Sequence, residues 1–224
     1  GWLNFGSDKM SKSKGNVIYS DDLLPIIGTD GIRHYVLSEM PYAADGSITY
    51  ENIIGRYNAD LANNLGNLVN RTAAMSKKYF DSVIQPPVAP APVDEELQAE
   101  AKKAFAQVQE SLDSYHVADA LDSVFALLRR ANKYIDETTP WVLAKNEEDR
   151  PRLGTVLYHL LETIRIGAVL LTPFLPGSAE KILTLLGGPE AGWESASCFG
   201  ALTPGGKVGQ PEVLFARLDE EAVL

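Results

Sequence analysis

Residues 9–16, KMSKSKGN, alternate lysines with small hydroxyl side chains near the start of the chain. The ammonium groups of Lys9 and Lys12 could meet phosphate oxygens as mobile charges. Ser11, Ser13 and the backbone N–H groups would add further donors, and the glycine that follows allows a tight turn. This chemistry suits a loop that closes over a polyphosphate, whereas the plainer interpretation is a solvated surface loop.

A second group of side chains could read an unpaired nucleic acid base. Asn67 and Arg71 are four residues apart on a predicted helix, so they are neighbours on one face, outside its apolar stripe. They could present an amide and a guanidinium to the edges of a base, and Trp141, which follows Pro140, could stack on it. Each also has a plainer interpretation, namely a polar helix residue, a surface ion-pair partner and a core tryptophan.

Other polar residues give weaker indications. His34, His116 and His159 are dispersed and have no ligand spacing with Cys198, so we predict no metal site. Three more asparagines on the helix of Asn67 could add RNA contacts, and we assign them no role: Asn63, Asn64 and Asn70.

Composition limits the classes of protein. The chain has 224 residues and a net charge of −10, enough for one or two globular domains. Residues 1–80 hold 8 basic and 8 acidic side chains, and residues 81–224 hold 12 and 22, so any RNA surface must be a local face. A single cysteine, Cys198, suits a reducing compartment, and we expect a cytoplasmic protein without a signal sequence or membrane span.

The first 50 residues predict short mixed elements. We expect a strand end at 2–5 and another strand at 47–49, with a short helix through Ile27 and a helix from Asp30, as its cap, to Glu39. The segment looks too small to form a sheet of its own. It is therefore predicted to be the end of a larger α/β domain with a joining module.

From residue 51 the apolar spacing becomes helical, and the fold class we predict is mainly α, an antiparallel helical bundle over residues 51–188. Prolines between 86 and 92 predict an extended linker, and Pro173 and Pro176 predict a helix break at Phe174. Residues 189–224 are expected to be a tail that packs back on the core, with a docking strand at 213–215. The predicted helices cover 51–80, 94–112, 117–135, 153–171 and 179–186.

The run Lys9, Met10, Ser11, Lys12 and Ser13 resembles the KMSKS signature loop of the class I aminoacyl-tRNA synthetases. In that family the loop stabilises the pyrophosphate that leaves ATP when the amino acid carboxylate attacks the α-phosphate. The resemblance implies this role for Lys9 and Lys12, with Lys12 as the direct ATP contact. It assigns no role to Lys14.

Three later segments narrow the resemblance to the methionyl-tRNA synthetases. They are DLANNLGNLVNR at 60–71, NKYIDETTPWVLAK at 132–145 and LLTPFLPGSAEK at 170–181, and LFARL at 214–218 also fits. The resemblance implies that Asn67, Arg71 and Trp141 recognise the CAU anticodon of tRNA(Met). It further implies an ATP-dependent ligase for methionine that uses Mg²⁺ with ATP, and we expect a monomer.

The chain departs from the family pattern in one respect. The family's other ATP motif, His-x-Gly-His, does not occur in these residues, so we expect the chain to be inactive by itself. Residues 1–50 would then end the catalytic domain. Two alternatives remain: a synthetase for Val, Leu or Ile, which would show no preference for a CAU loop, and a noncatalytic tRNA-binding module, which would have no use for a pyrophosphate loop.

Overall fold

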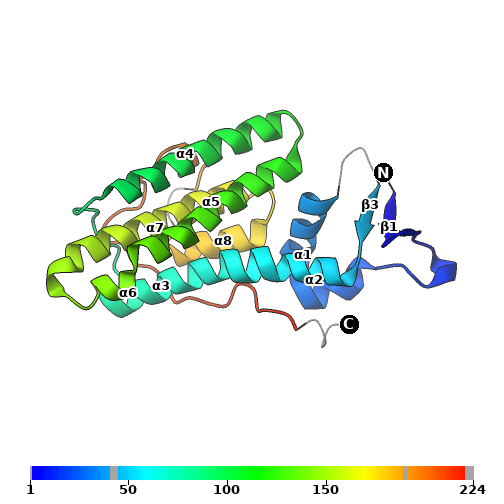
Figure 1. The fold of residues 1–224 in the computed structure, drawn as a ribbon, viewed down its shortest axis with the longest axis horizontal. Helices are drawn as coiled ribbons and strands as arrows, with labels where there is room; N and C mark the ends of the chain where they lie inside the picture. The colour runs from blue at the N-terminus through cyan, green and yellow to red at the C-terminus, as the bar shows by residue number, and fades with distance from the viewer. Residues whose placement is uncertain (1, 41–44, 189–190, 220–224) are drawn as a thin grey trace.

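The computed structural model describes residues 2–40, 45–188 and 191–219, and it is elongated (Figure 1). Long helices fill most of its length, and a small module of strands and helix lies at one end. The prediction of a mainly α fold with an antiparallel helical bundle is confirmed.

Three short strands form a sheet in the N-terminal module, and the expectation that this segment has none of its own is wrong. Strand β1 (Leu3–Phe5) pairs antiparallel with β2 (Asp8–Lys9) and parallel with β3 (Gly46–Ile48), in the order β2-β1-β3. The parallel partner comes from about forty residues later in the chain, and a pairing of that range leaves no local signal. The sheet fixes β2 within the module, and with it the start of residues 9–16, which we call the lysine loop.

Helix α1 (Ser20–Glu39) joins the two helices that we predicted on either side of Gly28. Gly28 has φ 67° and ψ 176°, a conformation that glycine tolerates, and this breaks the helical path. Asp30 does not cap the second part, because its carboxylate bonds to Ser178 in a different helix. That part of our prediction is wrong, although the helix does end at Glu39.

A continuous helical rod leads from the module into the bundle (Figure 1). It consists of α2 (Tyr50–Arg56), a π-helical segment η2 (Tyr57–Gly66) and α3 (Asn67–Phe80). Asn64 lies three and four residues from Leu61 and Leu68, which are buried, and it is buried with them. Asn67 and Arg71 are exposed.

The remaining helices form the bundle around α7 (Arg150–Leu171), in which every residue from Leu153 to Leu171 is buried. The span Glu147–Leu171 is long and apolar enough to cross a membrane, but its most apolar 18 residues (mean hydropathy 1.3) are entirely buried inside the protein, as in a core helix. The predicted break after α7 is confirmed at Phe174. The elements are α4 (Pro92–Asp113), α5 (Val117–Thr138), α6 (Pro140–Leu143), η3 (Glu147–Asp149), α7 (Arg150–Leu171), α8 (Pro176–Leu185) and η4 (Trp193–Ser197).

One buried carboxylate ties three of these helices together. Asp94, at the start of α4, accepts hydrogen bonds from the Tyr134 hydroxyl on α5 (2.6 Å) and from the Arg152 guanidinium on α7 (2.5 and 2.7 Å). It also accepts a bond from the Ala91 N–H, which caps its own helix. Burial alone would raise the pKa of the Asp94 carboxyl, but these donors hold it below its ordinary value.

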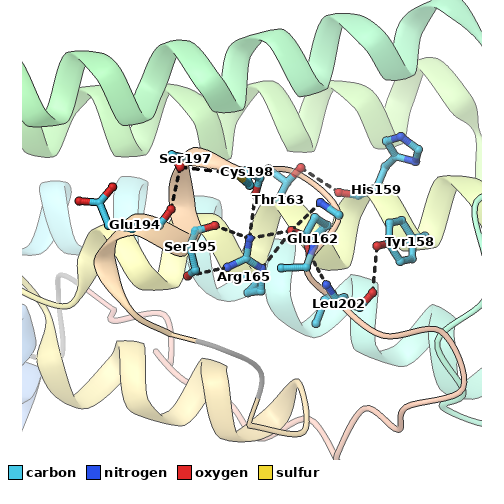
Figure 2. Close-up of polar contacts among 12 residues, drawn as sticks. Tyr158, His159, Glu162, Thr163, Arg165, Glu194, Ser195, Ser197, Cys198 and Leu202 are labelled. Atoms are coloured by element: carbon cyan, nitrogen blue, oxygen red, sulfur yellow. Dashed lines mark hydrogen bonds and ion pairs between the residues drawn. The ribbon is translucent and has the colours of Figure 1, made fainter.

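A second buried charge pair attaches the C-terminal tail to α7 (Figure 2). Glu162 and Arg165 have no exposed side-chain surface and pair at 2.7 Å. The Glu162 carboxylate also accepts bonds from the backbone N–H groups of Gly200, Ala201 and Leu202 at 2.9 to 3.0 Å. The tail backbone therefore supplies the donors that make this buried carboxylate tolerable.

The expected docking strand at 213–215 is wrong, because the structure has no strand there. The segment nevertheless packs on the π segment. The Phe215 ring lies edge-on to Tyr57 with centroids 5.8 Å apart, and the Leu218 backbone exchanges two hydrogen bonds of 2.9 Å with the Asn58 side chain. A side-chain amide thus replaces the strand partner that the apolar run suggested.

We predict that Glu162→Gln lowers the free energy of unfolding by about 3 to 5 kcal/mol, since it leaves Arg165 buried without its counter-charge and removes an acceptor from the tail. Urea unfolding followed by circular dichroism measures the change. Glu194→Gln, at an exposed glutamate of the same tail, should change it by less than about 0.5 kcal/mol. Equal stability of the two variants would contradict this role for Glu162.

A buried histidine lies where α1 meets the rod. Burial, and after it the positive charge of Arg56, lowers the pKa of His34 to about 4. His34 is therefore neutral near pH 7, and the 3.5 Å approach of its Nε2 to Asp60 is not an ion pair there. Its ring instead packs edge-on to Phe125 of α5, with centroids 4.9 Å apart. Burial also raises the pKa of Asp60, and Arg56 and Arg129 oppose that shift.

The free energy of unfolding should therefore fall as the pH is lowered through a defined range. The unfolded chain protonates His34 below its ordinary pKa of about 6.5, whereas the folded chain does so only near 4, so acid favours unfolding between these values. The loss for this group is about 3 kcal/mol in full. In urea unfolding across this range, His34→Gln should have a shallower pH dependence than the wild type. His116→Gln, at an exposed histidine, should keep the wild-type slope, and identical slopes for all three would refute the assignment.

Candidate functional site

The lysine loop is closed on itself by one side chain. Asn16 accepts a hydrogen bond from the Ser11 N–H through Oδ1 (2.8 Å) and donates to the Lys9 carbonyl through Nδ2 (3.3 Å). Gly15, at φ 69°, makes the turn that brings Asn16 back. A hydroxyl pair, Ser11 Oγ and Ser13 Oγ at 2.7 Å, lies inside the loop. Sequence reasoning missed Asn16, although its position directly after the glycine is a typical place for such a closing amide.

The charged side chains of this loop are accessible. Lys9 and Lys12 are exposed, and the Lys9 ammonium lies 4.0 Å from the centre of the exposed Trp2 ring. A cation over an aromatic face at such a site is held by only about 0.5 to 1 kcal/mol, so an anion can compete for it. Met10 packs against the core and anchors the loop between the two lysines. The arrangement suits capture of a polyphosphate.

The three side chains that we predict to read a base lie on the solvent side of the bundle. Asn67 and Arg71 are exposed on α3, and Trp141 is 43% exposed, so its interpretation as a core residue is wrong. Trp141 projects from a sharp corner at which Thr139 has φ 43° and Pro140 begins α6. A proline at the first helical position fixes this corner.

The contact between Arg71 and Asp136 bears on the alternative interpretation of Arg71 as a surface ion-pair partner. An Arg71 nitrogen lies 3.9 Å from Asp136 Oδ1, five residues before Trp141, with both side chains well exposed. An ion pair of that length and exposure contributes little to stability, so Arg71 stays available to a ligand. Sequence reasoning missed the approach of Asp136 to Arg71.

Asn64 is excluded as an RNA contact because it is buried. Its side chain donates to the Phe125 carbonyl (3.4 Å) and accepts from Asn132 Nδ2 (2.8 Å). Asn63 and Asn70 are exposed on the rod.

The structure does not bring the two groups of candidate residues together. The lysine loop lies in the N-terminal module at one end of the long axis, and α6 lies at the other end (Figure 1). Within the described ranges, no group of three or more His, Cys, Asp or Glu side chains is placed to hold a metal ion. The two candidate sites must therefore meet different parts of an extended ligand, or different ligands.

Comparison with known families assigns both halves of the chain. Residues 1–73 match the profile of the class I tRNA synthetases (M), and residues 86–224 match that of the anticodon binding domain of methionyl tRNA ligase. Curated relatives include the methionine–tRNA ligases of Clostridium acetobutylicum (50% identical over 98% of this chain) and Clostridium perfringens (47% over 100%). The chain spans about a third of the length of these relatives, 34% and 35%.

The fold agrees with this assignment. The Mycobacterium tuberculosis methionyl-tRNA synthetase in complex with methionyl-adenylate superimposes with a TM-score of 0.90 at 38% identity, over 97% of this chain and 43% of that one. A synthetase for Val, Leu or Ile is thereby excluded. The chain belongs to the methionyl-tRNA synthetase family and includes that family's anticodon-binding domain.

Proposed function

We propose that the chain is the part of a methionine–tRNA ligase that reads the CAU anticodon of tRNA(Met) and supplies one ATP loop. The observation that carries the proposal is that Asn67 and Arg71 are exposed on α3 and that Arg71 lies 3.9 Å from Asp136, on the helix that leads into the Trp141 corner. An exposed face of this kind provides hydrogen-bonding groups beside a stacking platform, which is what recognition of a splayed loop base requires.

At this face we assign base stacking to Trp141 and edge recognition to Asn67 and Arg71. The amide offers a donor and an acceptor, and the guanidinium offers a donor fork, so together they can distinguish bases by their edges. Arg71 would exchange its long contact with Asp136 for the RNA. The acidic residues that dominate 81–224 repel phosphate in general, which favours binding through base contacts over nonspecific attraction.

At the other end, Lys9 and Lys12 would act on ATP. As the methionine carboxylate oxygen bonds to the α-phosphorus, the bond from that phosphorus to the bridging oxygen breaks and pyrophosphate leaves with added negative charge. Cations placed at the leaving group stabilise this charge more in the transition state than in the ground state. Asn16 keeps the loop in shape, and release of Lys9 from Trp2 frees its ammonium for the phosphates.

The same proposal covers the remaining assignments. Residues 1–50 would end the catalytic domain, 51–188 would be the anticodon-binding bundle, and 189–224 would be a tail packed on it. The ligase would use Mg²⁺ bound by the ATP phosphates, which act as its ligands in many nucleotide enzymes. We expect a cytoplasmic monomer. Without a His-x-Gly-His motif among its residues, the chain alone is expected not to activate methionine.

We predict that the chain binds a CAU stem-loop more tightly than one with a changed anticodon, and that Trp141→Ala weakens CAU binding by about 1 to 3 kcal/mol and removes the preference. Fluorescence anisotropy with labelled stem-loops measures both. Trp2→Ala makes the same change at an exposed tryptophan in the module and should leave binding unaltered. Equal affinity of the wild type for both stem-loops would sink the anticodon assignment and favour a module of other specificity.

In the full-length enzyme, Lys12→Ala should slow ATP–pyrophosphate exchange by a factor that corresponds to about 2 to 4 kcal/mol of barrier, since it removes a contact to the leaving group. Stem-loop affinity should not change. Lys14→Ala serves as the matched control, because this exposed lysine lies just outside the five-residue motif. Normal exchange in the Lys12 variant would contradict the proposed ATP role.

A further inference from the structure

The break between α7 and α8 leaves backbone groups outside the regular hydrogen bonds of either helix. α7 ends at Leu171, α8 begins at Pro176, and Phe174 and Leu175 between them are buried. The carbonyls between the helices and the first N–H groups of α8 have no partners within a helix. Such groups need donors and acceptors from elsewhere.

Those partners come from α1, more than 140 residues earlier. The Asp30 carboxylate accepts bonds from the Ser178 N–H (2.5 Å) and the Ser178 hydroxyl (2.6 Å) at the start of α8. The Arg33 guanidinium donates to the carbonyls of Phe174 (2.7 Å) and Pro173 (2.8 Å) after the end of α7. The charges match the helix dipoles, with the anion at an N-terminus and the cation beside C-terminal carbonyls.

The fit at this contact is close. Asp30 and Arg33 are three residues apart, so both reach from one face of α1. A Cβ atom on Gly177 would lie 3.3 Å from Asp30 Oδ2, so a larger residue at that point of α8 would push against the Asp30 carboxylate. We call this set of four hydrogen bonds the brace.

The module has another connection to the bundle, which is the rod α2–η2–α3. Its middle ten residues are π-helical, and π segments interrupt the regular hydrogen-bond ladder at which helices bend. A rod with such a segment, if it were the only connection, would let the module tilt against the bundle. The brace holds α1 to the residues between α7 and α8 and to α8 itself, and His34 of α1 packs on Phe125 of α5. These contacts and the rod together fix the orientation.

We propose that Asp30 and Arg33 are positioning residues that set the distance and angle between the ATP-loop module and the anticodon-reading face. The inference rests on the proposed function, in which one rigid tRNA must meet both ends of this elongated protein at once. A ligand that spans two sites gains from both only when their spacing fits, and small misplacements are costly to the chemistry. Neither residue needs to touch RNA or ATP for this role.

The test compares ATP–pyrophosphate exchange and stem-loop binding, each of which needs one end of the protein, with the charging of whole tRNA, which needs both ends. In the full-length enzyme, Asp30→Ala and Arg33→Ala should each lower kcat/KM for charging whole tRNA by roughly tenfold to hundredfold. ATP–pyrophosphate exchange and stem-loop binding should stay at wild-type values, because each uses one end. Asp22→Ala, at an exposed aspartate of the same helix, should change none of the three. Arg33→Lys keeps the charge but not the two-pronged donor, so it should show an intermediate loss of charging.

A spin-label measurement on the chain itself checks the geometry. With Cys198→Ser as background, labels at Asp8→Cys in the module and Ala74→Cys on α3 should give one narrow distance distribution, and Asp30→Ala or Arg33→Ala should broaden it. An unchanged distribution, or normal charging by both alanine variants, would overturn the brace. A wild-type enzyme that neither prefers CAU nor charges tRNA would instead refute the proposed function, and the distance measurement would still decide the brace.

Discussion

The burial of α7 from Leu153 to Leu171 is the constraint on which the rest of this structure depends. A helix surrounded on every side needs partners that cover its whole circumference, and here α3, α4, α5, α8 and the tail provide them. Apolar packing covers most of this span, and two charged networks on the helix have partners. Arg152 bonds to Asp94 at the start of the helix, and Glu162 with Arg165 engages the tail in its middle.

The consequence is that the two candidate sites lie at opposite ends of one elongated body. The proposed anticodon-reading side chains are on α3 and at the α5–α6 corner, and both of these elements pack on this core. The lysine loop follows a small sheet outside the core, and its shape depends on a single closing amide, Asn16. Its lysines are exposed, so they are accessible to an anionic ligand.

Features that depend on residues close together in the sequence could be predicted, and features that depend on distant partners could not. The helices were predictable because a 3.6-residue period is local, and the exposure of Asn67 and Arg71 followed from that same period. The errors involve partners distant in sequence. Asp30 was expected to cap its own helix but caps one near residue 178, and the parallel strand pair has no local signal. The tail's apolar run packs without forming a strand, and Asn58 bonds to the tail backbone three residues beyond it, at Leu218.

The π-helical segment has a consequence for how this family can vary. The ten residues of η2 set the rotation of everything after them about the axis of the rod. Losing or gaining one residue there would rotate α3 as a unit and move Asn67 and Arg71 away from the exposed position they now occupy. Substitutions that keep the length of the segment preserve this orientation. The residue count of the segment is therefore a condition for the exposure of these two side chains.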